Sequence, residues 1–320
     1  MKGLENIGNT CFMNSCLQIL MNCDPLVKYI KSKKYNDDLN PLKRESQLFI
    51  DFVNLLTEQK AISIPIAFKK TLELFQSSYI GYRQHDSCEV MIHILDIFHD
   101  ALKYETNMKI IGKGITKHAK LCRMAYEIWI SNYRKEYSFL VETFHGQYHS
   151  QIICNECRTI THQFDPFSFI YLPINNVNNG DNIYDCFRKF TDTEILDNDN
   201  KYMCENCNKK VVAIKKTRLW KLPNILIIGF KRFNNAFMKI DKNIEYFYNL
   251  DLVDYYEQTL PCEYELFGVS IHEGGISGGH YYSYCLVNNI WYKFNDSDVS
   301  QISSEKVIDK NAYFLVFRKK

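Results

Sequence analysis

The sequence predicts an α+β fold in which helices come first and antiparallel strands follow. Apolar residues recur at helical spacing in the first part of the chain and at every second position in its last third. The pair Asn288-Asn289 between two alternating runs is typical of a hairpin turn. No linker or internal repeat divides the 320 residues, so we expect a single domain over residues 1–320.

The first expected helix runs over Cys11–Asn22. It is apolar on most of its faces, so we expect it to be buried. Asn9 or Thr10 can cap its beginning, and Asp24-Pro25 can stop it.

Two further helices are expected before the strands begin. One starts near Asp86, because apolar residues follow it at helical spacing, and another lies around Ala125–Tyr137. From about Phe144 the pattern changes to strands. The clearest alternating runs are Phe267, Val269, Ile271; His280, Tyr282, Tyr284, Leu286; and Tyr313, Leu315, Phe317.

The composition excludes several classes of protein. A hydrophobic fraction of 46% with 14% aromatics excludes intrinsic disorder. A net charge of +2 supports neither a nucleic-acid partner nor a membrane surface. No apolar run approaches the ~18 residues of a spanning helix, and residues 1–15 lack the apolar core of a signal peptide. With twelve cysteines, we therefore expect reduced thiols and an intracellular protein of the cytoplasm, the nucleus or both.

Cys11 is a candidate nucleophile because it lies in the first turn of the expected buried helix. The free N–H groups and the positive end of the helix dipole would stabilise a thiolate there and lower its pKa from about 8.5. The alternative is a small buried apolar residue, like Cys16 or Cys23.

A cysteine nucleophile needs a base and a group that orients the base. His280 follows the glycine loop Gly274–Gly279 and opens an expected strand. If the next strand is its neighbour, Asn295 or Asp296 can accept a hydrogen bond from one ring nitrogen, and the other nitrogen then faces the thiol. His272, before the loop, is expected to shape it.

Four other cysteines form two CxxC pairs separated by 46 residues: Cys154, Cys157, Cys204 and Cys207. Two such knuckles can complete a tetrahedral site with no open position, which indicates structural Zn²⁺. A redox pair is the weaker alternative, because the βαβ context of thioredoxin-like proteins is missing. No catalytic cofactor is expected.

Several motifs then point to a family. Gly3–Gln18 resembles the Cys box of the ubiquitin-specific proteases, which are papain-like deubiquitinating enzymes, and Gly278–Val299 resembles their His box. Gln84–Met91 is similar to the motif between the two boxes, and Ala312–Phe317 is similar to the closing strand of the family. The matches occur in the family's order and span nearly the whole chain.

The resemblance implies a role for each residue of the candidate active site. Cys11 would be the nucleophile, His280 the general base and Asn295 the residue that orients the imidazole. Asp296 would support the histidine or the attacking water. Asn6 would donate into the oxyanion hole together with the backbone N–H of the nucleophile.

The resemblance also implies a channel for the extended tail of ubiquitin. Gln84 and Asp86 match family positions that line this channel, and Tyr281 matches the aromatic residue that follows the catalytic histidine. These three are the candidate substrate-binding residues, and Asp86 is also a candidate N-cap of its helix. His85 replaces the second glutamine of the family motif, a departure that concerns the channel and not the triad.

The expected architecture is a helical thumb (1–143), zinc-bearing fingers (144–229) and an antiparallel palm (230–320). The expected function is thiol-dependent hydrolysis of (iso)peptide bonds at the C-terminal glycine of ubiquitin. The partners would be ubiquitin and ubiquitinated proteins, without nucleic acid or membrane, and a monomer is favoured. The alternatives are a catalytically silent ubiquitin-binding module of the same fold and a nucleic-acid-binding zinc domain.

Overall fold

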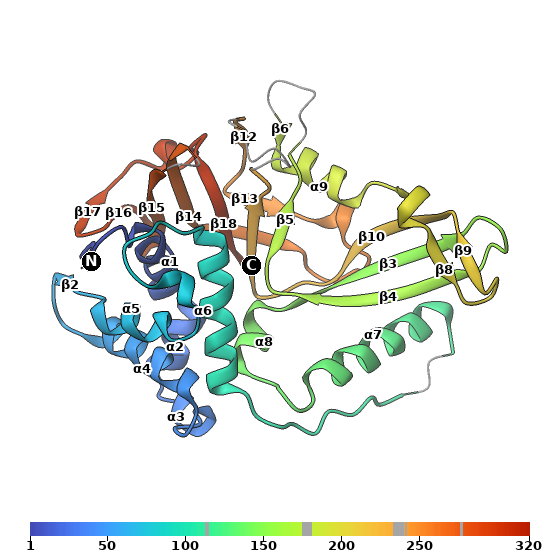
Figure 1. Ribbon diagram of the computed structural model, residues 1–320, viewed down its shortest axis with the longest axis horizontal. Helices are drawn as coiled ribbons and strands as arrows, with labels where there is room; N and C mark the ends of the chain where they lie inside the picture. The colour runs from blue at the N-terminus through green and yellow to red at the C-terminus, as the bar shows by residue number, and fades with distance from the viewer. Residues whose placement is uncertain (113–114, 175–180, 233–239, 241, 276–277) are drawn as a thin grey trace.

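The computed structural model describes residues 1–112, 115–174, 181–232, 240, 242–275 and 278–320. A group of helices and a large central sheet pack together at one end of the longest axis of the molecule, and a long narrow sheet extends toward the other end (Figure 1). The predicted α+β fold is therefore confirmed. The glycine loop includes residues 276 and 277, which lie outside the described part.

The first part of the chain forms a compact group of helices. These are α1 (Cys11–Met21), α2 (Asp24–Lys31), α3 (Tyr35–Asp38), α4 (Arg44–Thr57), α5 (Ile66–Glu73), η1 (Ser77–Tyr79) and α6 (Ser87–Leu102). Every residue of α1 is buried, as predicted. Thr10 precedes α1 but makes no capping hydrogen bond with its side chain. Asp24-Pro25 does not simply end this helix; it begins α2, where the missing N–H of proline costs nothing.

The central sheet has eight strands, seven of them in the order β17-β16-β15-β14-β18-β11-β5, with β13 paired to β14. Their bounds are β5 (Ile170–Leu172), β11 (Ile225–Phe230), β13 (Asn249–Asp251), β14 (Glu263–Gly275), β15 (Gly278–Val287), β16 (Ile290–Asn295), β17 (Asp298–Gln301) and β18 (Ala312–Lys319). One apolar core joins this sheet to the helices, and a second covers its other face. The buried helix α1 packs directly against β15, and this packing positions the candidate site.

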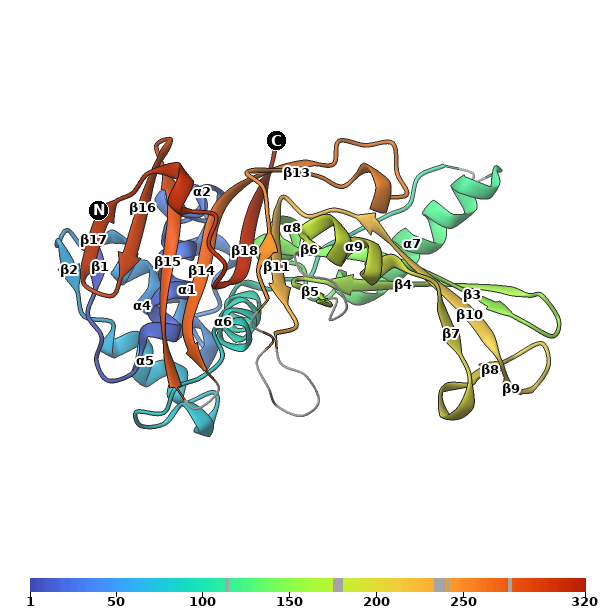
Figure 2. The same ribbon diagram turned by 90° about the horizontal axis from the view of Figure 1, so that it is seen from above.

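The long sheet has four strands in the order β4-β3-β10-β7 and projects away from the helices (Figure 2). Its elements and the small hairpin at its tip are β3 (Gly146–Cys154), β4 (Ile160–Phe167), β7 (Glu194–Leu196), β10 (Ala213–Lys221), β8 (Tyr202–Cys204) and β9 (Lys209–Val211). The remaining elements are β1 (Gly3–Leu4), β2 (Ile62–Ser63), α7 (Lys117–Tyr133), α8 (Phe139–Phe144), β6 (Asp181–Asn182), α9 (Ile183–Thr191), η2 (Asn198–Asn200), β12 (Ile244–Glu245), η3 (Val253–Tyr255) and η4 (Ser304–Lys306).

Two helices differ from the sequence prediction. The helix expected around Ala125–Tyr137 is α7, which begins earlier because the Thr116 side chain caps it by accepting from the N–H of Ala119. Helix α9 interrupts the region predicted as strands, and a capping box of Asn182 and Asp185 starts it.

The hairpin turn at Asn288-Asn289 is confirmed, with φ angles of 50° and 63° that suit asparagine. Strands β5 and β11 belong to the central sheet although they fall within or across the end of residues 144–229. In the described part of the chain, no helix combines the length and the apolar character that crossing a bilayer requires.

Candidate active site

Cys11 is the first residue of α1 and is only 2% exposed. Burial raises the pKa of its thiol, and the negative charge of Asp296 acts in the same direction. Hydrogen bonds from the backbone N–H groups of Tyr281, Phe12 and Cys11 act in the opposite direction but are outweighed. The prediction that the helix terminus lowers this pKa is therefore wrong, because the pKa is raised. The cost of desolvating the thiolate exceeds the stabilisation by the backbone N–H groups.

His280 and Asn295 lie together although β15 and β16 carry them on different strands. The imidazole Nε2 is 2.5 Å from the amide oxygen Oδ1 of Asn295. An amide oxygen only accepts, so Nε2–H donates and Nδ1 keeps a free lone pair. The Cys11 thiol lies beside the backbone of Tyr281, the next residue after His280. Among the described residues, no hydrogen bond joins the Cys11 sulfur to the imidazole.

Asp296 lies at the centre of a polar network beneath the histidine. Its Oδ2 is 3.9 Å from Nε2 of His280 and accepts a hydrogen bond of 2.9 Å from Nδ2 of Asn6. Its Oδ1 accepts a bond of 2.8 Å from Nδ2 of Asn14. The Asn6 side-chain oxygen accepts hydrogen bonds from the N–H groups of Gly8 and Thr10. Because both Oδ1 and Nδ2 of Asn6 are hydrogen-bonded, the orientation of its amide plane is fixed.

Asn14 is the residue of this network that the sequence analysis missed. It is 1% exposed on a helix that is otherwise mostly apolar, and it also donates to the carbonyl oxygen of Glu5 at 3.2 Å. A polar amide on such a face is costly unless it is hydrogen-bonded, and this could have singled it out. Its partner Asp296 is 282 positions away in the sequence.

The three expected channel residues have different surroundings. Gln84 is exposed and makes two hydrogen bonds to the backbone of Gly279. Asp86 caps α6 by accepting from the N–H groups of Cys88 and Glu89, which confirms its expected structural role.

The other oxygen of Asp86 accepts from the Tyr313 hydroxyl on β18. The Tyr281 ring is buried and stacks on His272, with ring centroids 4.3 Å apart. His272 lies against Gly279, since a Cβ atom on Gly279 would come within 2.3 Å of its Nε2. The glycine loop that His272 is expected to shape includes residues 276 and 277, outside the described part of the chain.

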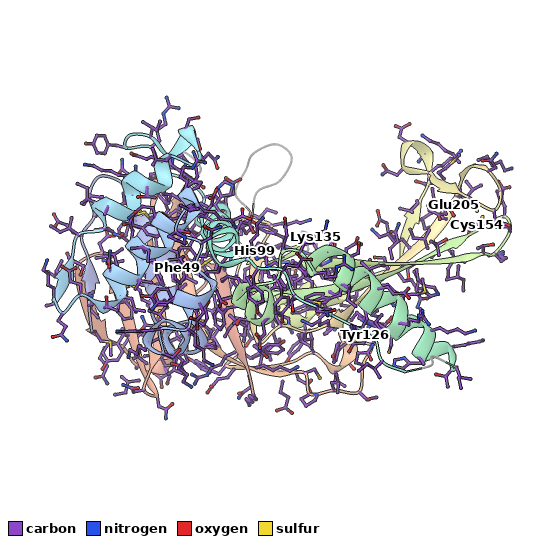
Figure 3. All side chains as sticks on the ribbon, turned by 90° about the horizontal axis from the view of Figure 1, so that it is seen from below. Phe49, His99, Tyr126, Lys135, Cys154 and Glu205 are labelled. Atoms are coloured by element: carbon purple, nitrogen blue, oxygen red, sulfur yellow. The ribbon has the colours of Figure 1, made fainter. Side chains whose placement is uncertain are left out.

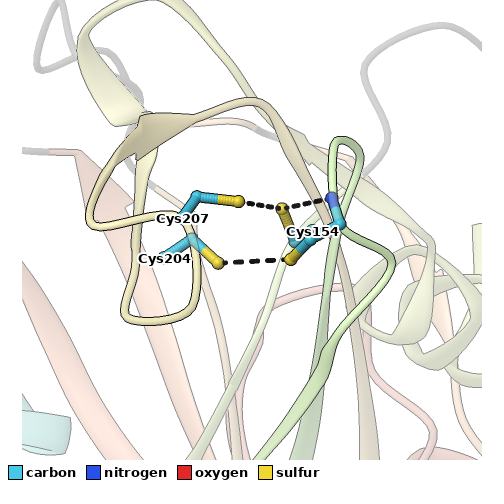
Figure 4. Close-up of side chains that lie close together, drawn as sticks. Cys154, Cys204 and Cys207 are labelled. Atoms are coloured by element: carbon cyan, nitrogen blue, oxygen red, sulfur yellow. Dashed lines mark hydrogen bonds between the residues drawn. The ribbon is translucent and has the colours of Figure 1, made fainter.

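A cluster of four thiols lies at the tip of the long sheet, formed by Cys154, Cys157, Cys204 and Cys207. All four sulfur atoms lie within 4.8 Å of one another. Figure 4 shows two of the contacts between the knuckles, which are 3.8 Å for Cys154–Cys207 and 3.7 Å for Cys157–Cys204. Figure 3 places Cys154 and Glu205 at this tip, far from Phe49 among the helices.

The cluster fits a tetrahedral metal ion and not a pair of disulfides. A zinc ion with four thiolates at about 2.3 Å requires sulfur atoms about 3.8 Å apart, whereas a disulfide requires about 2.05 Å. Arg158 follows the first knuckle with a φ angle of 61°, and Asn208 follows the second with a φ angle of 50°. The two turns therefore have similar local geometry. The four cysteines can therefore hold a metal ion in a closed site, remote from Cys11.

Comparisons with known proteins agree on one family. A family model for ubiquitin carboxyl-terminal hydrolase matches residues 2–317. The chain is 32% identical to ubiquitin carboxyl-terminal hydrolase 2 of Bos taurus over 98% of its own length and 54% of the relative. It is 33% identical to the Gallus gallus protein of the same name, over 98% of this chain and 92% of the relative.

A solved structure is also similar over the whole chain. It is that of the SAGA Ubp8/Sgf11/Sus1/Sgf73 DUB module bound to ubiquitin aldehyde, with a TM-score of 0.79 and 26% identity, covering 100% of this chain and 70% of that one. The chain spans about half the length of the bovine relative, so it corresponds to part of that longer protein. The match over residues 2–317 and the identity above 30% lead to one conclusion: the chain belongs to the ubiquitin carboxyl-terminal hydrolase family.

Proposed function

We propose that this chain is a cysteine-type deubiquitinase that hydrolyses (iso)peptide bonds at the C-terminal glycine of ubiquitin. The observation that carries the proposal is the hydrogen bond of 2.5 Å between Nε2 of His280 and Asn295, which leaves Nδ1 free as a base near the Cys11 helix. A nucleophile, a base and an orienting group are the parts that thiol hydrolysis needs.

The reaction begins when Nδ1 of His280 takes the proton of the Cys11 thiol. The thiolate attacks the carbonyl carbon of the ubiquitin terminal glycine, and the bond to the lysine nitrogen breaks as the imidazolium protonates that nitrogen. Water, deprotonated by the same imidazole, then attacks the thioester and releases the ubiquitin carboxylate and the thiol.

The surrounding amides stabilise the charges that develop. One N–H of the Asn6 amide is used by Asp296, and the other is available for the oxyanion together with the backbone N–H of Cys11. One such donor contributes about 2.7–4 kcal/mol in related chemistry. Asp296 stabilises the imidazolium at 3.9 Å, and Asn14 holds the Asp296 carboxylate in this position.

We also propose that the four cysteines bind one structural Zn²⁺ and that the long sheet grips the body of ubiquitin. The helical thumb (1–143), fingers (144–229) and palm (230–320) would then surround the substrate. The long sheet projects beyond the central sheet. Its tip curves toward the side of the molecule on which β14 ends and β15 begins, close to the candidate site (Figure 2). Two solved relatives, one bound to monoubiquitin and one to ubiquitin aldehyde, support ubiquitin as the partner.

The test mixes ubiquitin that carries a C-terminal electrophile with the wild type and with Cys11→Ala. A covalent adduct with the wild type alone is the expected result, because Cys11 is the proposed nucleophile. A wild type that binds ubiquitin and retains zinc but forms no adduct would refute the protease proposal. That outcome would favour the silent ubiquitin-binding module.

A further inference from the structure

The Gln84 side chain binds the backbone of Gly279 with both ends of its amide. Its Nε2 donates to the Gly279 carbonyl oxygen at 2.6 Å, and its Oε1 accepts from the Gly279 N–H at 2.9 Å. Gly279 directly precedes His280 on β15. The amide therefore ties a loop of the helical region to the strand that carries the candidate base.

The same loop contacts the segment before the nucleophile. The Asn9 side chain donates to the carbonyl oxygen of Tyr82 at 2.8 Å. The Tyr82 ring lies directly over Gly8, where a Cβ atom would come within 2.3 Å of a ring carbon. Tyr82 and Gln84 thus connect the residues that lead into Cys11 with the residue that leads into His280.

The loop is anchored on both sides of Gln84. Before it, the buried Lys69 ammonium donates to the carbonyl oxygens of Tyr79 at 2.8 Å and Gly81 at 3.2 Å. After it, Asp86 caps α6 and binds the Tyr313 hydroxyl. These anchors fix the position from which the Gln84 amide reaches Gly279.

At the beginning of β15, the strand edge that faces away from β14 has no strand partner in the described part of the chain. The pairing of β15 with β16 runs from Ser283 to Val287 and stops short of Gly279. The Gln84 amide satisfies one N–H and one C=O in this stretch, as a neighbouring strand does elsewhere in the sheet.

We propose that Gln84 is a positioning residue, which braces the Cys11 segment against the His280 segment before ubiquitin binds. The proposal rests on the proposed function and changes the role expected for Gln84 from contact with the ubiquitin tail to alignment of the site. Without the brace, the two segments separate, and water reaches the Cys11 thiol. Catalysis then falls while the chemical reactivity of the thiol rises.

The test compares Gln84→Met, which removes both hydrogen bonds, with Gln84→Glu, which retains only the acceptor. Arg83→Ala, at the exposed neighbouring position, is the control. Hydrolysis of a fluorogenic ubiquitin amide gives kcat and KM. Alkylation of Cys11 by iodoacetamide without ubiquitin, followed by mass spectrometry of its peptide across pH, gives the thiol reactivity. Thermal unfolding confirms that each variant folds.

For Gln84→Met we expect kcat to fall about tenfold, the loss of two modest hydrogen bonds, with KM within about twofold. Alkylation of Cys11 should become faster, with its pKa moving back toward the ordinary value for cysteine. Gln84→Glu should lie between this variant and the wild type. A raised KM with unchanged kcat and unchanged alkylation would instead assign Gln84 to the ubiquitin tail and overturn the proposal, and so would a rise in kcat.

The two proposals fail in different ways. If the wild type forms no ubiquitin adduct, the proposed function fails, but the alkylation profile still shows whether Gln84 shields Cys11. If the adduct forms and Gln84→Met leaves both kcat and alkylation unchanged, only the brace is refuted.

Discussion

Substitution of Gly279 by alanine tests whether the beginning of β15 fixes the position of the base. A Cβ atom on Gly279 would lie 2.3 Å from Nε2 of His272 and 2.6 Å from the carbonyl oxygen of Glu273. Real Cβ contacts are essentially never shorter than 3.0 Å and ordinary contact starts at 3.4 Å, so something must move by about 0.7–1.1 Å. His272 is buried and stacks on Tyr281, so we expect the strand to move and to carry His280 with it.

A shift of about 1 Å in a catalytic group costs about a hundredfold in rate. We therefore expect kcat/KM for a fluorogenic ubiquitin amide to fall about a hundredfold in Gly279→Ala. The free energy of unfolding should fall by about 1–3 kcal/mol, as is usual for overpacking. Gly275→Ala is the matched control, because a Cβ there meets nothing within 4 Å. Wild-type activity in Gly279→Ala, or an equal loss in both variants, would refute the reasoning.

Four further predictions follow from the buried polar groups and the thiol cluster. Because burial raises the Cys11 pKa, its alkylation without ubiquitin should still accelerate above about pH 9, and a plateau below about pH 8 would contradict this. Asn14→Leu removes a hydrogen-bond donor from Asp296, so it should lower kcat about tenfold and lower the free energy of unfolding in urea by about 1–3 kcal/mol. Unchanged values of both would show that this hydrogen bond contributes neither to catalysis nor to stability. Elemental analysis should find one zinc per chain, and the Cys204→Ser variant should lose the zinc and unfold at a lower temperature. A wild type that is as stable without metal as with it would exclude a structural role for the ion. Burial lowers the pKa of His145 to about 3, so the stability that its neutral form provides above about pH 6.5 is lost as the pH falls, by about 2 kcal/mol near pH 5. His145→Gln should therefore show a flatter profile of unfolding free energy in acid, and a profile as steep as that of the wild type would overturn this expectation.

Local patterns were sufficient to predict the elements that carry the site. The helix of Cys11 is apolar on nearly every face, and the run of residues after Asp86 is long and strongly periodic. In both cases the helix that the local pattern predicts is also the one that tertiary packing stabilises. The hairpin between β15 and β16 follows from the conformational preference of two asparagines. This turn pairs the two strands and thereby brings His280 close to Asn295.

The parts that sequence reasoning missed depend on polar helix ends or on distant partners. The beginning of α7 carries lysine and histidine, so no apolar period marked it, although Thr116 was available as a cap. Helix α9 has only nine residues, too few for its period to stand out against the strands around it. The pairing of Gln84 with Gly279 spans 195 positions, and no local pattern specifies such a contact.

The two ends of the chain meet at the candidate site, and Asp296 is the point at which they meet. The Leu4 N–H donates to its backbone oxygen at 2.9 Å, while Asn6 and Asn14 donate to its two carboxylate oxygens. Gly3 lies so close to Ser297 that a Cβ atom would come within 2.2 Å of the Ser297 carbonyl oxygen. The segment that precedes Cys11 is therefore held by the turn that follows Asn295. Asp296 thus contacts the Cys11 segment through Asn6 and Asn14 and lies 3.9 Å from Nε2 of His280, so one carboxylate links two segments whose residues Cys11 and His280 are 269 positions apart in the sequence.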